Sequence, residues 1–184
     1  MRTLSLLTVA GALAAAAPAL ATPPSATTTA KVPSAQSQCR TERDAVGRST
    51  FALTYGTNAN RANAFGKCVS KRNAATRAAR RAARVNAAQQ CRAAQQSDAA
   101  AFAAAWGQGR NAYGKCVSTT AREQTAATVW RQVKAHISAA RSCRDERRAD
   151  PAAFAARYGT GTGGKHGAFR RCVATTAAVN ANAR

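Results

Sequence analysis

Six cysteines are the residues whose type and spacing most clearly indicate a chemistry. Three of them open successive segments of the chain at an interval of 52 residues (39 to 91, then 91 to 143), and three close those segments. In chain order they are Cys39, Cys68, Cys91, Cys116, Cys143 and Cys172. In an exported protein an even number of cysteines predicts a disulfide framework. We expect no metal and no cofactor, because the chain has no C-x-x-C pair and neither His136 nor His166 has the spacing of a ligand.

Acid–base catalysis is the least favoured chemistry. The carboxylates of the mature chain are Glu42, Asp44, Asp98, Glu123, Asp145, Glu146 and Asp150. A general acid–base pair needs two titratable groups that converge on one cleft, and no spacing here indicates such a pair. Asp98 and Asp150 are better explained as helix caps, and His136 as a structural or solvated histidine. We therefore expect no enzyme activity and no catalytic residue.

A glycine-rich segment at 163–167 is a weaker candidate for phosphate binding. Its backbone N–H groups, together with Lys165 and His166, could face an anion. The segment lacks the spacing of a P-loop, so a plain flexible loop is the favoured interpretation.

Arginine supplies the strongest candidate site. From Ala45 to Ser97 there are ten Lys or Arg residues and no Asp or Glu. Four of them follow a spacing of i, i+3, i+4 and i+7 and would share one helix face: Arg77, Arg80, Arg81 and Arg84. Guanidinium groups suit phosphate recognition, so this face is the predicted anion-binding site. The alternative is a solvated face opposite an alanine side of the same helix, made of Ala75, Ala78, Ala79 and Ala82.

The net charge supports a binding function. Twenty-eight Lys and Arg against seven Asp and Glu give +21, a field that attracts anionic polymers and surfaces. We predict a secreted, polycationic, non-catalytic protein that binds anionic cell-envelope polymers, such as phosphate-rich wall polymers, or acidic lipids. One alternative is a structural spacer or scaffold whose charge is incidental. Another is non-specific binding to nucleic-acid phosphates. This alternative ranks lower because export favours an envelope partner. In addition, only Trp130 lies outside the repeated aromatic frame, and it belongs to a predicted helix seam, so no aromatic platform remains for stacking on bases.

The repeated aromatic frame indicates which helices hold the cysteines and arginines. Between its two cysteines each segment carries three aromatic residues in a fixed order: Phe51, Tyr55 and Phe65; Phe102, Trp106 and Tyr113; Phe154, Tyr158 and Phe169. A short helix is predicted before the glycine that follows the second aromatic residue. In the third segment Asp150 would be its N-cap, Pro151 its first residue and Gly159 its stop. Long helices are predicted from about residue 63 to 94 and from about 112 to 147, because no Pro interrupts these stretches and their Gly residues lie near the start.

The long helices restrict the disulfide pairing. Cys68 and Cys91 on one helix would be about 35 Å apart, and Cys116 and Cys143 about 40 Å apart. A disulfide needs Cα atoms within about 7 Å, so those pairs are excluded. The segment frame then favours the pairs Cys39–Cys68, Cys91–Cys116 and Cys143–Cys172. On the second long helix a heptad-like packing seam is predicted at Ala126, Trp130, Val133, Ile137 and Ala140.

We therefore expect an all-α fold of three tandem disulfide-stapled modules, with long helices joined by short helices in a solenoid or bundle. The three copies are copy 1 (39–90), copy 2 (91–142) and copy 3 (143–184). A signal peptide is predicted at 1–21, with cleavage near Ala21, followed by a Pro/Ser/Thr-rich leader at 22–38. No transmembrane segment is expected, so the mature protein would be secreted or associated with the cell envelope.

The chain is poor in bulky apolar residues. After the predicted cleavage site it has one Leu, one Ile, nine Val and five Phe, and most of its apolar residues are alanine. Alanine favours helices but buries little area, so apolar burial alone would not hold a fold at this charge. We expect the disulfides to be needed for folding.

The sequence motif F-x-x-x-Y-G-T-N…N-A-F-G-K-C-V-S at Phe51 to Ser70 resembles repeats in uncharacterised secreted cysteine-repeat proteins of high-GC Gram-positive bacteria. The resemblance extends from Cys39 to about Thr176 and is best in copy 1. Copies 2 and 3 depart in the loop, and copy 3 has Arg170 and Arg171 in place of Gly-Lys. The resemblance implies export and repetition, and it implies no site because no activity is established for the group.

Overall fold

The computed structural model describes residues 31–159 and 164–182, and this part of the chain contains helices and no strand. The helices are α1 (Ala35–Val46), α2 (Arg48–Tyr55), α3 (Ala64–Ser97), α4 (Ala99–Trp106), α5 (Ala112–Ala149), α6 (Pro151–Tyr158) and α7 (Gly164–Asn182). The predicted all-α class is confirmed. The predicted signal peptide and most of the predicted leader lie outside the described residues, as do residues 160–163 and 183–184.

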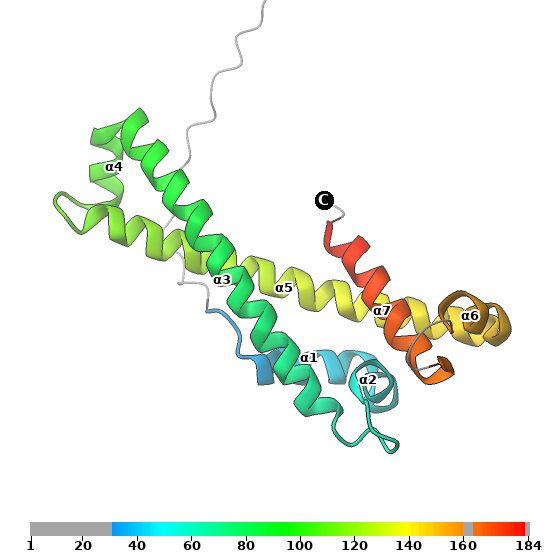
Figure 1. Ribbon diagram of the computed structural model, residues 1–184. Helices are drawn as coiled ribbons and strands as arrows, with labels where there is room; N and C mark the ends of the chain where they lie inside the picture. The colour runs from blue at the N-terminus through cyan, green and yellow to red at the C-terminus, as the bar shows by residue number, and fades with distance from the viewer. Residues whose placement is uncertain (1–30, 160–163, 183–184) are drawn as a thin grey trace, which may run out of the picture.

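Two long helices, α3 and α5, set the dimensions of the molecule and cross each other (Figure 1). They have 34 and 38 residues, which correspond to about 50 and 57 Å at 1.5 Å per residue. Each is rich in Ala and Arg, which are good helix formers. Neither contains Pro, and the only glycine of each lies near its start, at Gly66 and Gly114. The predicted long helices are confirmed to within one turn.

Aspartates end the long helices and begin the short ones. Asp98 has an extended backbone and follows α3, and its carboxylate accepts a hydrogen bond of 2.8 Å from the N–H of Ala101 in α4. Asp150 does the same between α5 and α6, accepting from Ala152 and Ala153 at 3.0 and 2.8 Å. Both predicted caps are confirmed. Each aspartate makes the chain turn sharply because its own dihedral angles leave the helical region.

Copy 1 uses glycine where the other copies use aspartate. Gly47 joins α1 to α2 with φ of +84°, which a residue with a side chain would adopt only with strain. Before it, α1 begins at Ala35, so the last four residues of the predicted leader are helical. Ser34 caps this helix, and Gln38 is buried within it.

Three disulfides join helices that flank each short helix: α1 to α3, α3 to α5 and α5 to α7. Cys39 of α1 is bonded to Cys68 of α3. The second disulfide, Cys91–Cys116, joins α3 to α5, and the third, Cys143–Cys172, joins α5 to α7. The Cα–Cα distance is 6.0 Å in each. The predicted pairing is therefore confirmed.

The core is divided between two places. The larger part combines copies 1 and 3, where the first and third disulfides pack with Phe51, Tyr55, Phe154 and Phe169 against the second half of α5. The smaller part lies around the Cys91–Cys116 disulfide, Phe102 and Ala112, at the end formed by α4. Figure 1 shows this end well separated from α1, α2, α6 and α7. The end of the molecule formed by α4 therefore shares little of the larger core.

Between the two cores, α3 and α5 meet through small residues. Ala83 and Ala87 of α3 are buried against Ala121 of α5, which lets the two backbones approach closely. The predicted alanine side of α3 is partly wrong, because Ala78 and Ala82 are exposed. The buried stripe is rotated by about one residue, toward Ala79, Ala83 and Ala87.

The predicted seam of α5 is wrong at Trp130, whose side chain is 39% exposed. Val129 is fully buried in its place, while Ala126, Val133 and Ala140 are buried as predicted. A single heptad seam assumes one partner along the whole helix. Here α5 packs on α3 in its first half and lies against both α1 and α7 in its second half, so its buried face widens. None of the described helices has the length and hydropathy needed to cross a bilayer.

Candidate functional site

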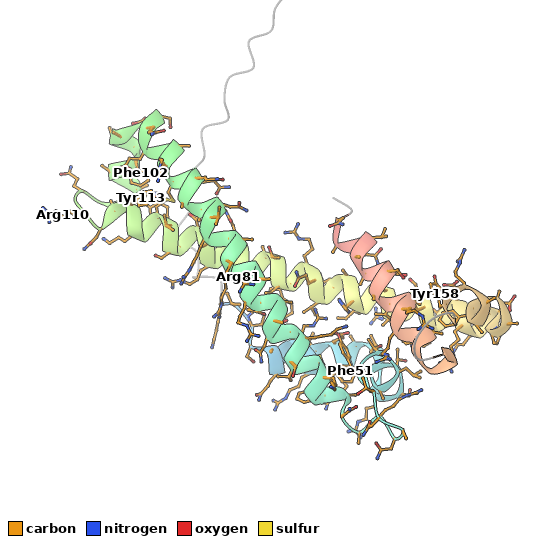
Figure 2. All side chains as sticks on the ribbon, viewed as in Figure 1. Phe51, Arg81, Phe102, Arg110, Tyr113 and Tyr158 are labelled. Atoms are coloured by element: carbon orange, nitrogen blue, oxygen red, sulfur yellow. A yellow bond between two sulfur atoms is a disulfide. The ribbon has the colours of Figure 1, made fainter. Side chains whose placement is uncertain are left out.

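The four predicted anion-binding arginines are all exposed on α3, but only two of them line the same groove. Arg80 and Arg84 line a groove between α3 and α5, whereas Arg77 and Arg81 are not among its lining residues. Figure 2 shows Arg81 on α3 near the crossing with α5. The difference follows from helix geometry, because Arg80 and Arg84 lie beside the stripe that faces α5, and Arg77 and Arg81 lie farther round the helix.

We call this space the basic groove; its volume is about 970 Å³. Its lining residues come from the segment before α1, from α3 and from the first half of α5: Lys31, Val32, Arg80, Arg84, Ala88, Tyr113, Gly114, Val117, Ser118, Ala121, Arg122 and Thr125. Four of these residues are cationic, and none of the described lining residues is Asp or Glu. Small apolar residues cover much of the rest of the wall. The groove thus combines a cationic rim with a floor that is partly apolar.

The cations of the basic groove are not neutralised by neighbours. The ion pairs formed within the described residues involve other side chains, so none of them includes Lys31, Arg80, Arg84 or Arg122. All four residues are exposed. Cations gathered without counter-charges repel one another and raise the local concentration of anions.

The walls of the basic groove are held in place by bonds between α3 and α5. The hydroxyl of Tyr113 donates to the backbone oxygen of Ala88 at 3.0 Å. The side chain of Gln124 donates to that of Gln90 at 2.8 Å. The Cys91–Cys116 disulfide joins the same helices next to these contacts. The arrangement is thus largely pre-formed before any ligand binds.

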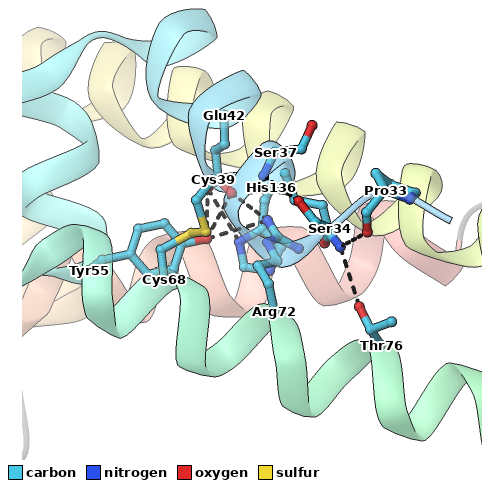
Figure 3. The surroundings of a disulfide bond; sticks show 11 residues. Pro33, Ser34, Ser37, Cys39, Glu42, Tyr55, Cys68, Arg72, Thr76 and His136 are labelled. Carbon is cyan, nitrogen blue, oxygen red and sulfur yellow. Dashed lines mark hydrogen bonds and ion pairs between the residues drawn. A yellow bond between two sulfur atoms is a disulfide. The ribbon is translucent and has the colours of Figure 1, made fainter.

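A second group of polar residues lies in the larger core, and we call it the buried cluster. It consists of Glu42 from α1, Tyr55 from α2, Arg72 from α3 and His136 from α5 (Figure 3). The Tyr55 hydroxyl lies 2.8 and 2.9 Å from the two carboxylate oxygens of Glu42. The guanidinium of Arg72 donates to Glu42 and, at 3.4 Å, to the Tyr55 hydroxyl. The His136 Nδ1 atom lies 3.9 Å from Glu42.

Burial controls the protonation of this cluster. The side chains of Glu42 and Arg72 are only 1% and 4% exposed, so each charge is compensated by the other. Burial raises the pKa of Tyr55, and the Glu42 carboxylate raises it further. Burial lowers the pKa of His136 to about 3, and the charges of Arg72 and Lys71 act in the same direction. At neutral pH the tyrosine is therefore protonated and the histidine is neutral.

The sequence did not indicate this cluster. The spacing of the carboxylates indicated no acid–base pair converging on one cleft, and it gave no sign that Glu42 would lie against Tyr55 and His136. Its partners come from three other helices, which helical periodicity does not relate to one another. One available signal was the glutamate three residues after the first cysteine, present as Glu42 and Glu146 but replaced by Ala94 in copy 2.

The chemistry open to Glu42 is limited. Both of its oxygens accept hydrogen bonds, and the residue is fully buried. A carboxylate held in this way compensates Arg72 and is poorly placed to take a proton from a substrate.

The other predicted residues have local roles where the structure describes them. Asp44 pairs with Arg43, and Asp145 pairs with Arg144. Glu146 pairs with Arg157 of α6 at 3.1 Å. All six cysteines form disulfides. In the candidate phosphate segment, residues 164–167 form the start of α7, so the expected flexible loop is wrong there. Residue 163 and the side chains of Lys165 and His166 lie outside the described part of the chain.

Comparison of the chain with protein-family models, with curated proteins and with solved structures gives no match. The resemblance to secreted cysteine-repeat proteins therefore stays a prediction, and the functional argument rests on the geometry of the molecule.

Proposed function

We propose that this protein is secreted and binds anionic cell-envelope polymers, above all phosphate-rich wall polymers, in the basic groove, without catalysing a reaction on them. One observation carries the proposal: four unneutralised cations from three segments of the chain line a single groove without a carboxylate among its described lining residues.

The size of the basic groove favours a polymer over a small ion. A volume of about 970 Å³ is at the upper end of the range of ligand sites, about 300–1,000 Å³. Arginine pairs well with phosphate oxygens through two parallel hydrogen bonds. Arg77 and Arg81 lie on the same helix outside the groove and extend the cationic surface along α3.

Export and repetition are part of the same proposal. Three disulfides are typical of a protein that folds in an oxidising compartment. We infer that residues 39–90, 91–142 and 143–184 are tandem versions of one module. The equivalent positions of their disulfides and short helices support this inference.

The test is retention on purified cell walls that carry phosphate polymers, measured across a salt gradient. The groove variant is Arg80→Gln/Arg84→Gln/Arg122→Gln. The matched control, Arg92→Gln/Arg110→Gln/Arg131→Gln, removes the same charge at exposed positions outside the groove. We expect the groove variant to elute at clearly lower salt than the control. Equal elution would show that only net charge matters, and no retention of the wild type at low salt would favour the scaffold alternative.

Non-specific nucleic-acid binding is the second candidate, and the exposed ring of Trp130 favours it. The sequence placed this tryptophan in a packing seam, but its side chain is 39% exposed and could stack on a base. The same salt gradient on duplex and single-stranded DNA tests this candidate. Retention on single-stranded DNA that falls with Trp130→Ala, at salt concentrations where wall retention is lost, would favour nucleic acid over wall polymers.

A further inference from the structure

A second cleft, separate from the basic groove, lies beside the buried cluster. Its volume is about 350 Å³, and it shares no lining residue with the basic groove. Helices α3, α5 and α7 supply most of its wall, and Tyr55 of α2 supplies the rest. We call it the alanine cleft. Its size falls within the range of small-molecule sites.

The alanine cleft has two chemically different parts. Its polar residues are Tyr55, Lys71, Arg72, Gln132 and His136. The remaining lining residues are all alanines from α3, α5 and α7: Ala75, Ala135, Ala174, Ala177, Ala178 and Ala181. None of the described lining residues is Asp or Glu. The wall therefore offers a short apolar surface next to two cations and an amide.

The polar part of the wall has more donors than acceptors. The Nε of Arg72 and the Nδ1 of His136 are buried, and neither has a hydrogen-bond partner among the described residues. Among the described residues, the carboxylate in contact with this group is that of Glu42, which already accepts from Tyr55 and Arg72 and does not line the cleft. A buried charged donor without a partner destabilises the protein, so an added acceptor at this place is favourable. Lys71 is exposed at the same wall and adds a positive charge, with its ammonium 6.0 Å from the centre of the Tyr55 ring.

We propose that the alanine cleft binds a small amphiphilic anion, with its anionic head at Lys71, Arg72 and Gln132 and its aliphatic tail along the alanines. The head would be a single carboxylate or phosphate, since both groups accept charge-assisted hydrogen bonds. The methyl groups of the alanine wall suit an aliphatic tail.

The first experiment measures binding of octanoate and octyl phosphate to the full protein by calorimetry, below their micellar concentrations. Acetate tests the tail, and octyltrimethylammonium tests the charge. We expect octanoate or octyl phosphate to bind at least tenfold more tightly than either control. Equal binding of acetate would show an adventitious anion site. Equal binding of octyltrimethylammonium, or no binding of either amphiphilic anion, would overturn the proposal.

Variants at exposed positions locate the binding without disturbing the core. Lys71→Gln should weaken octanoate binding about tenfold or more through loss of a charge-assisted hydrogen bond. Its matched control is Lys67→Gln, since Lys67 is exposed on the same helix and does not line the cleft. If both variants bind equally, Lys71 does not contact the head.

A steric variant tests the tail end. Ala178 is exposed and lines the cleft, so Ala178→Phe should block the tail without unfolding the protein. Val179→Phe is the control, because Val179 is 68% exposed and is not a lining residue. Unchanged octanoate binding in Ala178→Phe would contradict the assignment. The groove variant Arg80→Gln/Arg84→Gln/Arg122→Gln should bind octanoate as the wild type does, which separates this site from the polymer-binding site.

Discussion

At the scale of single residues, a glutamate and a tyrosine occur together or not at all. Copy 1 has Glu42 with Tyr55, and copy 3 has Glu146 with Tyr158. At the equivalent positions copy 2 has alanine and tryptophan, so the hydrogen-bond donor and its acceptor are both replaced. The hydroxyl–carboxylate distance is 2.8 Å in copy 1 and 3.4 Å in copy 3. The tyrosine and the glutamate therefore form one structural pair, in which the hydroxyl needs the carboxylate as its acceptor.

Copy 1 adds a buried charge to this pair, which predicts unequal effects of the same substitution. Glu42→Gln would leave Arg72 buried without a counter-charge and should lower the free energy of unfolding by about 3 kcal/mol or more. Glu146→Gln is the matched control and should cost much less, because the Glu146 side chain is 38% exposed. Urea unfolding with intact disulfides measures both. Equal losses would mean that Arg72 does not depend on Glu42.

His136 predicts a specific dependence of stability on pH. Its pKa is near 6.5 in the unfolded chain and is lowered to about 3 in the folded protein by burial, Arg72 and Lys71. Between these values the unfolded state binds more protons, so stability should fall as the pH decreases from about 6.5, by at most about 1.4 kcal/mol per pH unit.

The comparison is between the wild type and His136→Gln, with urea midpoints measured at pH 7, 5 and 4. The difference between the two curves of stability against pH reports the effect of the imidazole alone, because Glu42 is present in both proteins. We expect the wild type to lose more stability than the variant on acidification. Parallel curves would show that the imidazole is protonated in the folded state.

At the scale of elements, the two cores make copy 2 the least supported part of the chain. Its core consists of the Cys91–Cys116 disulfide, Phe102 and Ala112, with Trp106 and Tyr113 partly buried against them. The α4 helix has eight residues, too few to be stable alone in water. The disulfide therefore supplies stability to copy 2 that copies 1 and 3 gain by packing against each other.

Removing that link should loosen one end of the molecule. In Cys91→Ala/Cys116→Ala we expect hydrogen exchange to rise in residues 98–112 while α1, α2 and α7 stay protected. In the control Cys39→Ala/Cys68→Ala, the larger core loses its cross-link, and the melting temperature of the whole protein should fall. Exchange that rises equally everywhere in the first variant would show a single cooperative unit.

The sequence predicted those elements whose signals are local. Asp98, Asp150 and Pro151 mark helix ends through their own backbone chemistry. The disulfide pairing followed because a continuous helix keeps Cys68 far from Cys91. The burial of Val129 in place of Trp130 was not predictable, because it depends on which helices cross α5 and at what angle. The basic groove was missed in part for the same reason, since Arg122 faces Arg80 and Arg84 only through that crossing.

At the scale of the whole molecule, a high charge is carried by a core of small side chains. The largest fully buried side chains are Gln38, Glu42, three valines, Thr125 and five cysteines, with no Leu, Ile, Met or Phe among them in the described chain. Self-repulsion at a net charge of +21 opposes the compact state. Each disulfide closes a loop of 25 or 29 residues and should contribute about 3–4 kcal/mol. Together they are comparable to the entire stability of a typical domain, about 5–15 kcal/mol.

Complete reduction should therefore abolish the folded state. After reduction at neutral pH we expect the far-ultraviolet circular dichroism to lose its cooperative thermal transition, with residual helix only in the alanine-rich stretches of α3 and α5. Added salt should restore part of the helix, because it screens the repulsion between arginines. Reoxidation of the same sample is the control and should return the original transition. If the reduced protein melts cooperatively within a few degrees of the oxidised one, the packing of alanines is sufficient to hold the fold, and the disulfides are not needed for folding.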